Sequence, residues 1–345
     1  MAIAKVVVMV GNGFDLKAGL NTGAKDFLEH FINEPSSGPG QRVRDCINRD
    51  GIETWADYEE RIGYYAAEIE ASTEPLEVER EFFYAKRALD ELLRNYLSLQ
   101  DERIDEQFVA SNCKDCMDSL SDWIGLLAPR ERQNMLKRLS SRPLEVRYKL
   151  LCFNYTRTLN ELAQPVLGAQ LTPKQFADST INHSLSGFRH VHGTLSDMPI
   201  CGVDDSDQIH SETLFSSEMV ELTTVKRFMQ QMTGSEDDLL AMEDLKESSV
   251  VIVFGMSFGI TDRRWWSAVY DQLSSNDNKY VVICVKGLSE MSHIPADYYQ
   301  LTQSWKSRFF DAAGIDSSNL LPEVVGRVFV IPADRFLIVS QPLMV

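Results

Sequence analysis

The chain has 345 residues, of which 44% are hydrophobic and 25% are charged, proportions that are ordinary for a globular protein. They exclude a largely disordered, collagen-like or membrane-spanning chain. Acidic residues number 51 and basic residues 34, and a net charge of −17 argues against nucleic acid as the main partner because it repels phosphate. Residues 1–5 lack the charged region of a signal peptide, so we expect a cytoplasmic protein without a membrane partner.

Apolar, β-branched runs recur along the chain, and helical stretches separate most of them. The runs lie at 5–11, 149–154, 189–192, 250–255, 280–285 and 327–331. This alternation is typical of an α/β protein, and it predicts a Rossmann-like parallel sheet with helices on both faces.

Residues 53 to about 140 differ from the rest because their apolar residues follow helical spacing and no strand-like run interrupts them. We therefore predict a nucleotide-binding α/β domain made of residues 1–40 and 145–345, with a helical insertion or lid at 41–144. Residues 34–41 are rich in proline, glycine and serine and are expected to form a loop.

Two glycines follow the first predicted strand in the run Gly11-Asn12-Gly13. Glycines at a strand-to-helix turn let the backbone approach a ligand, and the amides of the next helix favour a diphosphate. Leu16 replaces the third glycine of the dinucleotide-binding pattern. A plain tight turn capped by Asn12 and Asp15 therefore remains an alternative.

Asn154 and His192 end two predicted strands, at the sheet edge where open α/β sheets bind ligands. The Asn154 carboxamide can hold a water or a ribose hydroxyl, or else it caps the next helix. His190 and His192 are expected on one face of a short strand, and His192, nearer its end, suits a general base. The alternative for His192 is a hydrogen-bonded core residue. No metal is expected, because no third ligand has a compelling spacing.

The run Gly255-Met256-Ser257-Phe258-Gly259 has the GxSxG spacing of a serine-hydrolase nucleophile elbow. A serine hydrolase would need a histidine later in the chain, and His293 is the one that follows. This interpretation leaves the first glycine motif without a role.

Together these motifs resemble the AbiH family of bacteriophage abortive-infection proteins. The segments that carry the resemblance are VVVMVGNGFDLKAGLNTGAKDFL at 6–28, Trp55 with Glu59, FNYTRTLNEL at 153–162, VHG at 191–193, CGVDD at 201–205 and VFGMSFGITD at 253–262. The resemblance covers most of the chain, and the GNGFDL start is its most distinctive part.

The same motifs, in the same order, are also similar to the sirtuin-like fold, in which a glycine loop cradles the diphosphate of NAD. This similarity implies that Asn154 and His192 are catalytic. It also implies cofactor-binding residues, namely Gly11, Asn12, Gly13, Asp15, Thr22, Gly255, Ser257 and Asp262. The chain departs from that pattern, since Thr156 stands where an Asp is usual and the four-cysteine zinc module is absent.

The resemblance implies a phage-defence protein that binds NAD or a related dinucleotide as its substrate and hydrolyses the nicotinamide–ribose bond. A phage component is the implied trigger, and Trp55 and Glu59 are implied to form a lid or merely to pack their helix. The rival functions are a non-catalytic nucleotide-binding or phage-sensing module and a serine hydrolase at Ser257. Whether the chain forms a homo-oligomer stays open.

Overall fold

The computed structural model describes residues 3–33, 41, 45, 49, 51–138, 145–176, 179–197, 199–291, 294–316 and 320–344. Most of the loop predicted at 34–41 lies outside these residues, and so does His293, the histidine that a serine hydrolase at Ser257 would need.

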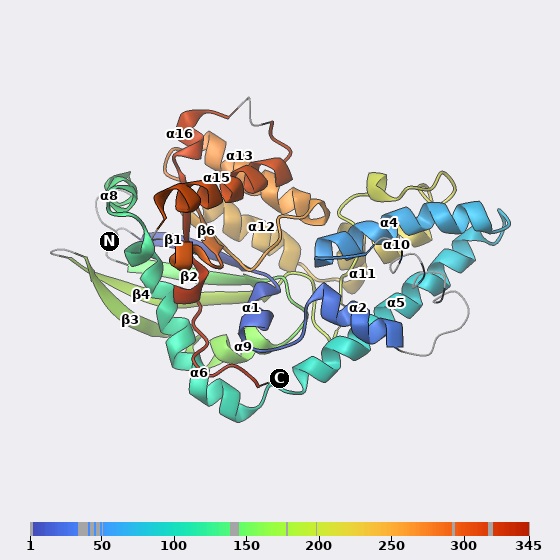
Figure 1. Ribbon diagram of the computed structural model, residues 1–345, viewed down its shortest axis with the longest axis horizontal. Coiled ribbons are helices and arrows are strands. Elements are labelled where there is room, and N and C mark those ends of the chain that lie inside the picture. The colour runs from blue at the N-terminus through green and yellow to red at the C-terminus, as the bar shows by residue number, and fades with distance from the viewer. Residues whose placement is uncertain are drawn as a thin grey trace.

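A seven-stranded sheet lies at the centre of the molecule, in the order β3-β4-β2-β1-β5-β6-β7 (Figure 1). Its strands are β1 (Ile3–Val10), β2 (Glu145–Cys152), β3 (Gln170–Phe176), β4 (Ser179–His190), β5 (Val250–Phe254), β6 (Tyr280–Val285) and β7 (Val328–Pro332). All pairs are parallel except β3 with β4. The predicted α/β fold is confirmed.

The six parallel strands have the order of a doubly wound sheet, with β1 in the middle. The chain runs outward from β1 through β2 to β4 and then crosses back to β5 on the other side of β1. Ligands of such sheets bind outside the carboxyl ends of the strands at this switch point. The switch point here lies between β1 and β5.

The strand around the two histidines differs from its prediction. β4 begins at Ser179 and ends at His190, so His192 lies in the turn beyond the strand, and the prediction of two histidines on one strand face is wrong. β3 and the first part of β4 were not predicted, because both contain many polar residues and lack an apolar, β-branched run. An antiparallel pair at a sheet edge keeps solvated faces and needs no apolar run.

Helices cover both faces of the sheet because alternate residues of β1 point to opposite sides (Figure 1). Val6 and Val8 face one core, and Val7 and Met9 face the other. The first core holds α1 (Gly13–Lys17), α6 (Glu106–Asp118), α7 (Trp123–Leu126), α8 (Pro129–Arg138) and α9 (Thr158–Ala163). The second holds α12 (Asp237–Glu247), α13 (Arg263–Ser275), α14 (Leu288–Met291), α15 (Pro295–Ala312) and α16 (Pro322–Val325).

A third core lies to one side of the sheet, and helices and loops supply its residues (Figure 1). Its helices are α2 (Ala24–Asn33), α4 (Trp55–Ser72), α5 (Val78–Asp101), α10 (Glu218–Thr224) and α11 (Lys226–Thr233). The helices expected between 53 and 140 are present, but they divide between two cores. α4 and α5 join the third core, whereas α6 to α8 pack on the sheet.

None of the helices in the described ranges is long and apolar enough to cross a membrane.

Candidate functional site

The glycine turn after β1 packs directly against the loop that follows β5. The amide of Gly11 donates to the carbonyl of Phe254, and that of Gly13 donates to the carbonyl of Gly255, both over 2.9 Å. A Cβ on Gly13 would lie 2.5 Å from the Cα of Gly255, which itself has a φ of 67°. These glycines are therefore required by the close approach of the two loops, and their contact with a ligand stays a prediction.

Asn12, Thr22 and Trp55 form one hydrogen-bonded group beside this turn. The Asn12 Nδ2 donates to the Thr22 carbonyl over 2.9 Å, and the Thr22 hydroxyl donates to Asn12 Oδ1 over 2.7 Å. The indole Nε1 of Trp55 donates to the same carbonyl over 2.8 Å. The first residue of α4 is thereby fastened to the turn after β1.

Asp15 and Asn154 lie buried behind the turn, with exposed fractions of 1% and 6%. The Thr156 hydroxyl donates to Asp15 Oδ2 over 2.6 Å. Burial raises the pKa of Asp15 to about 6, although the hydrogen bond from Thr156 opposes this. Within the described part of the chain, Asp15 Oδ1 and Asn154 Nδ2 have no partner at full hydrogen-bonding geometry, although the Asn154 side chain lies close enough to Asp15 to oppose the rise of its pKa. Unpartnered buried polar atoms are costly, and a bound ligand or water would satisfy them.

Four ionisable side chains from separate segments meet near the carboxyl ends of the strands. We call them the charge cluster: Glu59, His192, Lys226 and Asp262. The Lys226 ammonium group donates to Glu59 Oε2 over 2.9 Å, to Asp262 Oδ1 over 2.8 Å and to the Thr261 carbonyl over 3.0 Å. His192 Nε2 lies 3.6 Å from Asp262 Oδ1. Two carboxylates therefore share one buried cation beside an imidazole.

Burial and Lys226 separate the pKa values of the two carboxylates. Burial raises the pKa of Glu59 to about 7, and Lys226 opposes the rise. Burial also acts to raise the pKa of Asp262, but Lys226 holds it below its usual range. Burial, assisted by Lys226, lowers the pKa of His192 to about 3. Near pH 7, Asp262 is ionised, His192 is neutral and Glu59 is close to its midpoint. Carboxylates with such different pKa values are typical of acid–base sites.

The segment at 201–205 positions Lys226 and Asp262. Val203 accepts a backbone hydrogen bond from Lys226 and donates one to Thr224, both over 2.9 Å. A Cβ on Gly202 would lie 1.9 Å from the Thr224 carbonyl oxygen, so glycine is needed there. Asp204 Oδ2 accepts from the amide of Arg264 over 2.8 Å, which ties the segment to α13 directly after Asp262.

Lys226 is the member of the charge cluster that our sequence analysis missed. It lies 34 residues after His192 and belongs to none of the motifs. The one local signal is its place as the first residue of α11, where the helix dipole disfavours a cation. A lysine held there needs nearby carboxylates.

Ser257 lies on the exposed surface of the loop after β5. The strained residue of this loop is Phe258, with a φ of 55°, whereas a nucleophile elbow places the strain at the serine. Phe258 turns inward and packs on Trp266, with ring centroids 4.7 Å apart. The strain therefore buries an aromatic ring rather than presenting a nucleophile.

A model of the family described as bacteriophage abortive infection AbiH matches residues 7–284. The chain belongs to this family. The matched range contains the glycine turn, Asn154 and all four residues of the charge cluster. A comparison with curated proteins found no match. The protein is thus an abortive-infection, phage-defence protein of the AbiH family.

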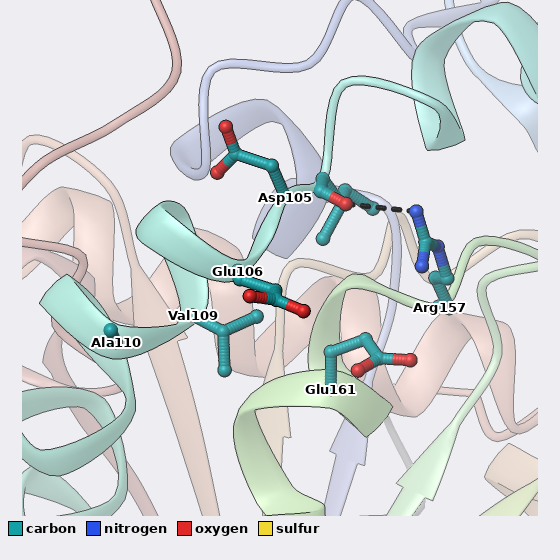
Figure 2. Close-up of a pocket in the computed structure, with 7 residues that line it drawn as sticks. Asp105, Glu106, Val109, Ala110, Arg157 and Glu161 are labelled. Atoms are coloured by element: carbon teal, nitrogen blue, oxygen red, sulfur yellow. Dashed lines mark hydrogen bonds between the residues drawn. The ribbon is translucent and has the colours of Figure 1, made fainter.

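Two surface pockets of this AbiH protein lie apart from the charge cluster. The first, of about 450 Å³, lies between α6 and α9, and Figure 2 shows Arg157 on its rim, where Nη2 donates to the Ile104 carbonyl over 2.8 Å. Its lining residues are Ile104, Asp105, Glu106, Val109, Ala110, Arg157 and Glu161. The second, of about 400 Å³, is lined by Lys25, Gly51, Ile52, Glu53, Asp57, Glu60 and Arg61. Neither pocket includes a residue predicted for the site.

Proposed function

We propose that this abortive-infection protein binds NAD or a related dinucleotide at the switch point of the sheet and hydrolyses its nicotinamide–ribose bond. The observation that carries the proposal is the buried pair of Asp15 and Asn154, whose Oδ1 and Nδ2 atoms lack a partner at full hydrogen-bonding geometry, beside the strand ends where doubly wound sheets bind ligands. The similarity of the motif order to the sirtuin-like fold supports the choice of dinucleotide.

The proposal gives the strand-end residues separate tasks. Gly11, Gly13 and Gly255 let the two strand-end loops pack closely beside the diphosphate, and Asn12 with Thr22 fixes the turn there. Those five residues shape the binding surface and do not react.

The reacting end of the dinucleotide lies toward Asn154 and His192 in this proposal. Asn154 orients a ribose hydroxyl or the attacking water with its side-chain amide, whose Nδ2 has no partner at full hydrogen-bonding geometry. His192, neutral near pH 7 because of its low pKa, hydrogen-bonds to the ribose. Ser257 and Asp262 follow β5 and line the phosphate or adenosine-ribose side. The transition state has oxocarbenium character at C1′ of the nicotinamide ribose.

A second function, a nucleotide-binding or phage-sensing module without catalysis, is favoured by a different observation. The amides of Gly11 and Gly13 and the carboxamide of Asn12 already have partners within the protein. His192, with a pKa near 3, is a weak base. A protein that only senses a nucleotide needs neither a free base nor a bound water.

The deciding experiment measures nicotinamide release from NAD by the purified protein, alone and with phage lysate, together with calorimetric binding of NAD. We expect release by the wild type, loss of release in Asn154→Ala, and retention in Asn160→Ala, a matched change on the surface of α9. Binding heat without any release would support the sensing module. If the protein neither binds NAD nor releases nicotinamide, both functions are overturned.

A further inference from the structure

The charge cluster contains a carboxylate that the helical insertion contributes to the edge of the sheet. Glu59 belongs to α4, whereas its partners belong to α11, η4 (Ile260–Asp262) and the turn after β4. The residue is 6% exposed, and its Oε2 lies 2.9 Å from Lys226 Nζ. A buried glutamate brought from a separate core to this edge requires an explanation beyond helix packing.

The first two turns of α4 are fixed to the strand-end loops at several points. Trp55 donates to the Thr22 carbonyl, and Ala56 lies so close to Gly259 that a Cβ there would be 2.1 Å from the Ala56 Cβ. One turn beyond Glu59, a Cβ at Gly63 would lie 2.0 Å from the Gln208 carbonyl oxygen. These contacts fix the axial position and rotation of α4, and therefore the place of the Glu59 carboxylate.

The chain of contacts from Glu59 reaches the residues of the proposed site. Lys226 joins Glu59 to Asp262, and Asp262 lies 3.6 Å from His192 Nε2. The His192 ring packs edge-on against Phe153, with centroids 5.1 Å apart, and Phe153 directly precedes Asn154. The glutamate is thus part of the same edge as the proposed ribose-binding groups.

We propose that Glu59 is the proton acceptor of the dinucleotide hydrolysis, and that Lys226, which also binds Asp262, holds it beside the reacting water. The inference rests on the proposed function. In this proposal the helical insertion contributes a reacting side chain to the site and does not only cover it.

The step balances with water as the second reactant. The water oxygen bonds to C1′ of the nicotinamide ribose while the bond from C1′ to the pyridinium nitrogen breaks. The electron pair of that bond passes to the nitrogen, and nicotinamide leaves neutral. The proton released by the water passes to the Glu59 carboxylate and then to solvent, leaving ADP-ribose as the other product.

Two candidates for the acceptor differ in their match to physiological pH. A base works best when its pKa lies near the working pH. The pKa of Glu59, about 7, meets this condition, whereas the pKa of His192, about 3, does not. The titratable groups that face Glu59 from the packed elements, and from α4 itself, are Lys226, Asp262, Tyr155, Cys201 and Tyr58. Burial keeps the tyrosines and the cysteine neutral, so Lys226 and Asp262 supply the charges around it.

The test compares wild type, Glu59→Gln and Glu59→Asp, with Glu60→Gln as the matched control on the next residue of α4. Rates of nicotinamide release are measured from pH 5.5 to 8.5, with NAD affinity by calorimetry and folding by thermal melts. Glutamine keeps an acceptor for Lys226, so we expect Glu59→Gln to lower kcat by about 10²- to 10⁴-fold while NAD affinity stays nearly unchanged.

The pH profile separates a proton acceptor from a structural residue. The wild-type rate should rise through pH 7 as Glu59 ionises; this rise should be absent from the residual rate of Glu59→Gln and return in Glu59→Asp. Glu60→Gln should match the wild type. A fully active Glu59→Gln with the wild-type profile would overturn the inference and leave the proposed function standing. A wild type that neither binds nor cleaves NAD would overturn both.

Discussion

Lys226 is the residue on which the charge cluster depends, because it is the shared cation of two buried carboxylates. Lys226→Met leaves Glu59 and Asp262 near each other without that cation. We expect a loss of about 3–5 kcal/mol in the free energy of unfolding, measured by urea denaturation. Lys246→Met, on the exposed end of α12, is the control and should change it by less than about 0.5 kcal/mol. If the two substitutions lowered the free energy of unfolding equally, Lys226 would not be the cation that stabilises the charge cluster.

Asp15 gives the protein a pH-dependent stability with a definite sign. Its pKa is about 6 in the folded protein and 3.8 in the unfolded chain, so the folded state binds more protons between these values. The stabilisation is complete below pH 3.8 and is lost as the pH rises through 6. A shift of this size corresponds to about 3 kcal/mol.

Asp15→Asn tests this dependence, because asparagine does not titrate. Between pH 5 and pH 7.5, the wild type should lose more unfolding free energy than Asp15→Asn does, as measured by urea denaturation at both pH values. Asp297→Asn, on the exposed first turn of α15, should keep the wild-type dependence. Parallel curves for wild type and Asp15→Asn would show that the Asp15 pKa is not raised.

Ser257 provides a test of the serine-hydrolase alternative at the level of one hydroxyl. We expect no labelling by an activated fluorophosphonate, because the positive φ falls on Phe258 and the serine lies exposed on the loop. Mass spectrometry of the treated protein makes the measurement. A label on Ser257 that disappears in Ser257→Ala would establish a nucleophile there.

The two strand-end loops behave as one element because their glycine backbones touch. A methyl group at Gly13 would meet the Gly255 backbone, so Gly13→Ala should lower the free energy of unfolding by about 1–3 kcal/mol. Gly125→Ala is the control, since it lies in α7 with open space around it and alanine favours helix. Thermal melts of both variants decide the matter, and a Gly13→Ala protein as stable as the wild type would show that the loops separate easily.

The helix α4 joins the third core to the sheet edge, and its sequence explains part of this role. Thr54 and Asp57 form a capping box that fixes where the helix begins. Tyr58, Ile62 and Tyr65 recur at helical spacing and enter the third core. Trp55 packs against the same core while its indole reaches the Thr22 carbonyl, and Glu59, one turn later, reaches Lys226 beside the strand ends.

The charge of the whole molecule bears on its partners. With 51 acidic and 34 basic residues, it should repel the phosphate backbone at long range. We expect no retardation of duplex DNA in gels at 50 mM salt and micromolar protein. Retardation that weakens as salt is added would show a local basic surface that overrides the net charge.

The sequence by itself was sufficient for the α/β class and for the parallel strands, because buried strands need long β-branched runs. VVVMV in β1, VVIVF in β5 and YVVICV in β6 are such runs. The helices between 53 and 140 were equally visible through their spacing. Edge strands with a solvated face, such as β3 and the first part of β4, carry no such run and escaped prediction.

Only the tertiary structure decided which side chains share a site. Glu59, His192, Lys226 and Asp262 are separated by up to about 200 residues in the chain, and no local pattern pairs them. The motifs predicted His192 and Asp262, the resemblance implied that Glu59 forms a lid or packs its helix, and Lys226 belongs to no motif. Their pKa values follow from burial and from charges within a few ångströms, both of which arise only when separate elements pack together. Local sequence patterns thus determine the strands of the sheet, whereas the ionisation of the charge cluster depends on contacts between residues far apart in the chain.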